Sequence, residues 1–231
     1  RAFENHGSGK ISLREILNPA IRLAERGFEL SHFEANRLNA YKTFFEKNKA
    51  ASKIFIRNNG RPWEEGQILI QKDLAKTLKR IARYGRDGFY SGSVAQLIVE
   101  EMKRGNGLIT KEDLLRYESK YRAPVLGTYK GHDIISMGPP SSGGALLVNM
   151  LNMLENYPMD TLGWNSSEYI HLLTEVERRA YADRAEHMGD PDFWDVPISM
   201  LTSKDYAKNR IKNINLDFAT LSSDISASKK V

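Results

Sequence analysis

The chain has 231 residues, of which 41% are hydrophobic and 27% charged, a composition typical of a globular protein with a sizeable core. It contains no cysteine, which excludes disulfides, thiolate zinc sites and cysteine nucleophiles. The net charge of +5 comes from basic residues dispersed among acidic ones, so we expect no nucleic-acid partner, and no apolar run approaches the roughly 20 residues of a membrane span.

The first half of the chain is predicted to be mainly helical and carries three capping boxes. In each, a hydroxyl accepts a hydrogen bond from a helix amide, and an acid three residues later reaches back to the capping amide. The pairs are Ser12 with Glu15, Ser31 with Glu34, and Thr110 with Asp113. Apolar periodicity predicts further helices at about 73–84 and 91–104, each ending near a glycine.

One stretch of the first half, residues 53–71, has a different period. Segments 53–57 and 67–70 lie on either side of Asn59-Gly60, a dipeptide typical of tight turns. The pattern predicts two short strands around this turn.

The second half is predicted to contain a hairpin, a turn and two longer helices. Residues 124–129 and 132–137 flank Lys130-Gly131 and predict the hairpin. The turn GPPSSGG at 138–144 follows, and then a helix to about residue 157. The last long helix is expected at about 166–188, capped by Asn165 and stopped by Gly189.

Together these elements predict a helix-dominated α+β fold over a single region, 1–231. The polar end at 215–231 is expected to be mobile, as is the entry at about 1–10. Since the chain begins with Arg1 rather than Met, we also expect it to be a piece of a longer protein.

The turn at 138–144 is the first candidate for chemistry. Its strand–turn–helix setting resembles a nucleophile elbow with Ser142 as nucleophile and His171 or His187 as base, although Pro140 stands where that motif has glycine. A helix start with small side chains also suits a bound anion. A third interpretation is a corner that lets the helix pack close to the sheet.

A second candidate is the acidic group Glu186, His187, Asp190 and Asp192, residue types that bind metal ions. The group straddles a predicted helix end, where Gly189 and Pro191 have structural roles. The sequence therefore predicts no metal site, and His171 is expected to be a satisfied or half-exposed histidine.

Several stretches in order along the chain resemble the large subunit of the γ-glutamyltranspeptidases. They are NPAIRLAERGFELS at 18–31, LAKTLKRIARYGRDGFYSGSVAQLIVEEM at 74–102, GLITKEDLLRYESKYRAPVLGTYKG at 107–131, MGPPSSGGALLVNMLNMLENY at 137–157 and EVERRAYADRAEHMGDPDF at 175–193. A departure is Gly138, where family members commonly have a third proline, and a looser turn is expected there.

The resemblance implies a fold and an activity. The fold is the four-layer αββα sandwich of the N-terminal-nucleophile hydrolases, of which this chain would supply a part. The implied enzyme cuts its own precursor before a threonine, which then takes the γ-glutamyl group from glutathione or a related amide and passes it to water, an amino acid or a peptide. No metal or organic cofactor is implied.

Because the catalytic threonine of the family lies beyond the large subunit, no catalytic residue is assigned to this chain. Ser141, Ser142, Gly143 and Gly144 are expected to form a wall of the substrate pocket. The alternative function is a non-catalytic helical binding or structural module related to the family.

The resemblance also implies a partner, the small catalytic subunit of the same precursor. Without it, this chain is expected to be inactive and to self-associate through apolar surface that the partner would cover. A periplasmic or secreted location is suggested by the family alone.

Overall fold

The computed structural model describes residues 1–57 and 59–228, and its contacts divide the chain into two compact units, Arg1–Ser119 and Lys120–Val231. The sequence predicts a single region over 1–231, and this domain assignment stays a prediction. The predicted mobile end includes residues 229–231, which lie outside the described residues.

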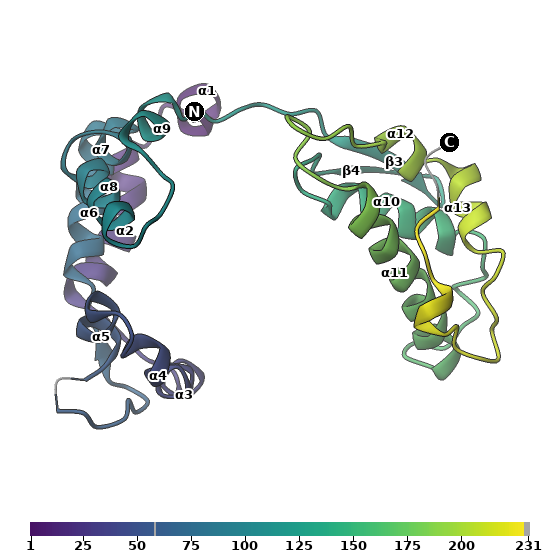
Figure 1. The fold of residues 1–231 in the computed structure, drawn as a ribbon, viewed down its shortest axis with the longest axis horizontal. Helices are drawn as coiled ribbons and strands as arrows, with labels where there is room; N and C mark the ends of the chain where they lie inside the picture. Colours follow the sequence, from purple (N-terminus) through teal and green to yellow (C-terminus); the bar gives the residue numbers. More distant parts are fainter. Residues whose placement is uncertain (58, 229–231) are drawn as a thin grey trace. The chain divides into compact units, whose positions relative to one another are not determined.

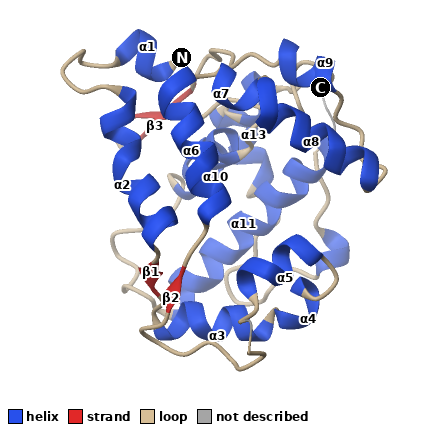
Figure 2. Cartoon of the chain, turned by 90° about the vertical axis from the view of Figure 1, so that its left-hand side faces the viewer, coloured by secondary structure: helices blue, strands red, loops and turns tan. Residues whose placement is uncertain are grey.

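The N-terminal unit is built almost entirely of helices (Figures 1 and 2). Helices α2 and α6 lie side by side, and Lys79 of α6 forms an ion pair with Glu25 of α2. All three predicted capping boxes are present, at the starts of α2, α3 and α9. The elements of this unit are α1 (Ala2–His6), α2 (Leu13–Arg26), β1 (Phe28–Glu29), α3 (His32–Ala40), α4 (Lys42–Phe45), α5 (Lys49–Phe55), β2 (Ile68–Leu69), α6 (Lys72–Tyr84), α7 (Asp87–Tyr90), α8 (Gly92–Arg104) and α9 (Lys111–Arg116).

The predicted strand at 53–57 is wrong, because residues 53–55 form the end of helix α5 and the two residues after it belong to no strand. Asn48 caps α5 by accepting hydrogen bonds from the amides of Ala50 and Ala51, at 2.9 and 3.1 Å. The apolar side chain of Phe55 packs in the small core around Leu30 and Leu69. The second predicted strand is present as β2, but it pairs antiparallel with β1 rather than with its predicted neighbour.

The C-terminal unit begins with the predicted hairpin. Its two-residue loop, Lys130 and Gly131, has φ values of 45° and 81°, as a type I′ turn requires. The elements of this unit are β3 (Val125–Tyr129), β4 (His132–Ser136), α10 (Gly143–Leu154), α11 (Ser167–His187), α12 (Ile198–Leu201), α13 (Lys204–Arg210) and the 3-10 turn η1 (Ser222–Asp224).

Helix α10 is the centre of the C-terminal unit and contacts the hairpin, α11 and α13 (Figure 1). Val148 of α10 packs against Gly127 of β3. A Cβ on Gly127 would lie 2.6 Å from a methyl group of Val148. On its other side, the core contains Met153 together with Leu172 and Val176 of α11. This core joins α10 to the buried face of α11.

The long helix is capped one residue later than predicted. Asn165 lies just outside α11 with φ of 55°, and the hydroxyl of Ser166 accepts the hydrogen bond from the Tyr169 amide at 3.1 Å. Serine is as good an N-cap as asparagine, so the sequence alone did not separate the two.

Candidate functional site

The turn between β4 and α10 is a tightly packed corner. A Cβ on Gly144 would lie 2.2 Å from the carbonyl oxygen of Met137, so only glycine fits this close approach. Gly138 is buried, and a Cβ there would lie 2.3 Å from the carbonyl oxygen of Ala123. The glycine that departs from the family pattern therefore allows a second close backbone contact. The peptide bond between Pro139 and Pro140 is cis.

Ser142 is the N-cap residue of α10, and its hydroxyl oxygen accepts a hydrogen bond from the Nε of Arg184 at 3.0 Å. A guanidinium ion stays protonated and cannot take the proton of an attacking hydroxyl. The two histidines proposed as bases bond elsewhere, His171 to the carbonyl of Asn215 and His187 to that of Ser228. The structure therefore does not bring a serine nucleophile and its base together.

The residues that follow Ser142 form the start of α10, and their backbone amides lie at its N-terminal end. The amide of Gly143 donates to the hydroxyl of Ser141 at 3.2 Å, and the helical ladder begins with the amide of Leu146 bonding to the carbonyl of Ser142. The amides of 143–145 thus precede the ladder, as at any helix start.

The acidic group after α11 is engaged in ion pairs. Asp192 accepts hydrogen bonds from Arg122 at 3.0 and 3.1 Å and from Lys120 at 2.8 Å. These hydrogen bonds, from Arg122 first, lower the pKa of Asp192 to about 2. In the part of the chain that the structure describes, no three histidine, aspartate or glutamate side chains are grouped so that they could hold a metal ion.

The most heavily bonded polar cluster of the C-terminal unit was not predicted from the sequence. Helix α11 carries Glu175, Arg179, Asp183 and His187 at intervals of four residues, with exposed fractions of only 1, 1, 1 and 5%. Four-residue spacing places these side chains along one face of a helix. We call these four residues the charged row.

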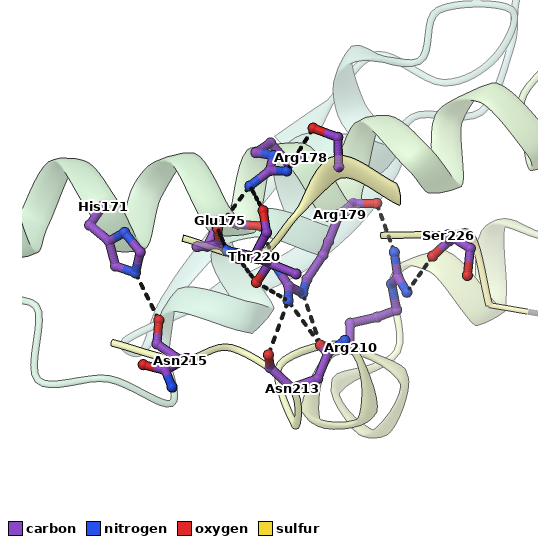
Figure 3. A network of polar contacts seen from close by, with 10 residues as sticks. His171, Glu175, Arg178, Arg179, Arg210, Asn213, Asn215, Thr220 and Ser226 are labelled. Atoms are coloured by element: carbon purple, nitrogen blue, oxygen red, sulfur yellow. Dashed lines mark hydrogen bonds and ion pairs between the residues drawn. The ribbon is translucent and has the colours of Figure 1, made fainter. Parts of the chain in front are cut away.

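Both carboxylate oxygens of Glu175, the first member of the charged row, accept hydrogen bonds. Its carboxylate accepts hydrogen bonds from Arg179 at 2.5 Å, from Arg178 at 2.9 Å, and from the amide and hydroxyl of Thr220 at 3.0 and 2.6 Å (Figure 3). Burial alone would raise the pKa of Glu175, but the hydrogen bonds from Thr220 and Arg179 outweigh it and lower the pKa to about 2.

The C-terminal end of the charged row, Asp183 and His187, is bonded to α13 and to Ser228. Asp183 accepts from the Nε of Arg210 at 3.1 Å, and Arg210 also donates to the carbonyl of Ser226 at 2.9 Å. Burial raises the pKa of Asp183, although Arg210 opposes this shift. Burial and the nearby Asp183 carboxylate raise the pKa of Tyr206 to about 12.

A sequence signal for the charged row does exist. The row lies one position before the apolar stripe of Leu172, Val176 and Ala180 on the same helix, and charged residues so close to a buried stripe are candidates for burial. None of the helices that the structure describes is both long and apolar enough to cross a membrane.

Comparison with protein families identifies the chain. The family model described as gamma-glutamyltranspeptidase matches residues 1–230. The chain belongs to the gamma-glutamyltranspeptidase family. Among curated relatives, it is 42% identical over 221 residues to the glutathione hydrolase proenzyme of Escherichia coli K12, and 39% identical over 209 residues to that of Bacillus subtilis 168. The matched regions are 96 and 90% of this chain but only 38 and 35% of those proteins.

Solved structures of gamma-glutamyltranspeptidases agree with this assignment. The Helicobacter pylori enzyme is 43% identical with a TM-score of 0.91, and the match covers 98% of this chain and 64% of that one. The Pseudomonas nitroreducens enzyme, solved in complex with L-DON, is 34% identical with a TM-score of 0.84 and coverage of 94 and 64%. The α+β class predicted from the sequence is confirmed, and the chain corresponds to a large-subunit fragment of the family.

Proposed function

We propose that this chain is part of the large subunit of an enzyme that cleaves γ-glutamyl amides such as glutathione. The enzyme transfers the γ-glutamyl group to water, an amino acid or a peptide. The observation that carries the proposal is the family match over residues 1–230, together with 42% identity to a glutathione hydrolase proenzyme.

The nucleophile of the proposed enzyme is a threonine downstream of this chain, which becomes N-terminal when the precursor cuts itself. Its hydroxyl adds to the preceding carbonyl, and the peptide C–N bond breaks to leave an ester and a free amine. Water then hydrolyses the ester, releasing the new carboxylate of the large subunit and restoring the hydroxyl. In turnover the same hydroxyl attacks the carbonyl of the γ-glutamyl amide, and the C–N bond breaks to give a γ-glutamyl ester and the free amine of the donor. Water or an acceptor amine then opens the ester and restores the hydroxyl, with no metal or organic cofactor.

In this proposal the turn at Ser141, Ser142, Gly143 and Gly144 forms a wall of the substrate pocket. The corner is well suited to that role, because Arg184 holds Ser142 and the packing of Gly144 against Met137 fixes the helix start. We further propose that the chain supplies mainly helices and a few strands of the four-layer αββα sandwich of the N-terminal-nucleophile hydrolases, completed by the small subunit.

The proposal is tested with the full-length precursor and this chain, purified separately and assayed with a γ-glutamyl chromogenic amide. The precursor should split into two subunits on a denaturing gel and then release product. The chain alone should release none. A precursor that stays intact and inactive would contradict the enzyme and favour a non-catalytic helical binding or structural module.

The location and the free state of the chain are part of the same proposal. We propose a periplasmic or secreted enzyme on the family resemblance alone, which cell fractionation tests. Self-association of the isolated chain is supported by the outer face of the hairpin, where the directly paired Leu126 and Ile135 are 64 and 73% exposed.

A further inference from the structure

Residues 213–228 lie against α11, and from Asn215 to Ser228 the segment runs in the same direction as the helix. The side chain of His171 bonds the carbonyl of Asn215 at 2.8 Å, and Arg178 bonds the carbonyl of Thr220 at 2.7 Å (Figure 3). Near the end of α11, His187 bonds the carbonyl of Ser228 at 2.7 Å. We call residues 213–228 the tail, and these contacts fix its path over four turns of the helix.

Polar contacts hold most of this path, although the apolar side chain of Ile214 packs against the core at its beginning. The large apolar side chains of Leu216, Phe218 and Leu221 are 58, 74 and 69% exposed. The charged row, by contrast, is almost fully buried, and its members bond tail backbone as well as tail side chains. Buried ionic hydrogen bonds have strict geometry, so they define one position for the tail.

Thr220 is the most heavily bonded tail residue. Its amide and hydroxyl donate to Glu175, its carbonyl accepts from Arg178, and its hydroxyl oxygen lies 3.3 Å from the Nη2 of Arg179. Arg179 in turn donates to the Asn213 side-chain oxygen at 2.9 and 3.2 Å. One buried ion pair therefore holds two points of the tail seven residues apart.

We propose that Glu175 and Arg179, acting through Thr220, are positioning residues for the self-cleavage of the precursor. This inference rests on the proposed function, in which the bond that is cut lies after the tail in the sequence. Attack by a hydroxyl within the same chain is fast only when the hydroxyl and the carbonyl are held at about 3 to 3.5 Å in a fixed orientation. The pair contacts no reacting atom, and its part is to fix the direction from which the chain approaches the cleavage site.

The test uses Thr220→Val in the full-length precursor, which removes one hydroxyl and leaves the Glu175–Arg179 pair and the tail backbone in place. We expect self-cleavage on a denaturing-gel time course to slow by about tenfold, as loss of a hydrogen bond to a charged group predicts. Thr220→Ser keeps the hydroxyl and should restore the wild-type rate. Ser223→Ala is the matched control, since among the described residues its hydroxyl bonds only to the adjacent Asp224.

A second readout separates positioning from general stability. The fraction of Thr220→Val that does cleave should have wild-type kcat/KM, and hydrogen exchange should increase in 213–228 but not in α10. Wild-type cleavage by Thr220→Val would overturn the inference, and so would a parallel loss of thermal stability and mature kcat/KM. A wild-type precursor that never cleaves would instead refute the proposed function, and this inference with it.

Discussion

Gly144→Ala tests the close contact that defines the corner before α10. The new Cβ would lie 2.2 Å from the carbonyl oxygen of Met137, and 3.0 and 3.1 Å from its carbonyl carbon and amide nitrogen. All three atoms are backbone, so no side chain can rotate away and the start of α10 must move. Overpacking of this kind costs about 1 to 3 kcal/mol, and a backbone obstacle places this site near the upper value.

Gly143→Ala is the matched control, one residue earlier in the same turn. Its Cβ would meet only the hydroxyl of Ser141, at 3.3 Å. Alanine is also the better helix former, so we expect a stability change below about 1 kcal/mol, in the stabilising direction.

The assay is urea unfolding of this chain at 25 °C, followed by tryptophan fluorescence. With a urea dependence of about 2 kcal/mol per molar, a loss of about 3 kcal/mol lowers the midpoint of Gly144→Ala by about 1.5 M. Equal midpoints for the two glycine variants would refute the packing argument.

Three further predictions concern the same unit. Ser142→Ala in the full precursor should lower kcat/KM no more than about tenfold, because it loses one hydrogen bond to Arg184. A fluorophosphonate probe should not label Ser142. Complete loss of activity in the variant would instead support Ser142 as the nucleophile. The pKa of Glu175 is lowered to about 2, so its stabilisation is fully present above the unfolded pKa near 4.5 and is lost as the pH falls through 2. Glu175→Gln should therefore be less stable at pH 7 but approach the wild-type stability as the pH falls from 5 to 2, and a constant difference in urea midpoint would contradict this. Ile135→Lys should reduce self-association of the chain in light scattering, since it places a charge beside Leu126 on the exposed hairpin face; unchanged association would place the contact elsewhere.

Local signals in the sequence predicted most elements of the fold. Capping boxes are made by residues three apart, so Ser12 and Glu15 needed no knowledge of the rest of the chain. The hairpin was equally local, because Lys130-Gly131 alone fixes a two-residue loop. The strand predicted at 53–57 failed because a stretch this short fits either period. The Asn48 cap and the packing of Phe55 against Leu30 and Leu69 favour the helix.

The site was predicted less well, because the turn at 138–144 stood out by composition alone. Its serines looked like possible nucleophiles, yet the partner of Ser142 is an arginine 42 residues away. No local pattern specifies that pairing. The role of the turn as a pocket wall stays a prediction.

The charged row was missed for a different physical reason. Taken separately, α11 offers charged side chains and the tail offers polar ones, and each segment looks like solvated surface. Burial becomes favourable only when both are present, because an unpaired buried charge is costly and a paired, fully bonded one is tolerated. The Glu175 carboxylate accepts a hydrogen bond from Thr220, which lies 45 residues later in the sequence. A charged stripe beside an apolar stripe of a helix is therefore a candidate for burial when the sequence also contains a polar segment that can bond it. That segment can lie far away along the chain, and each of the two allows the other to be buried.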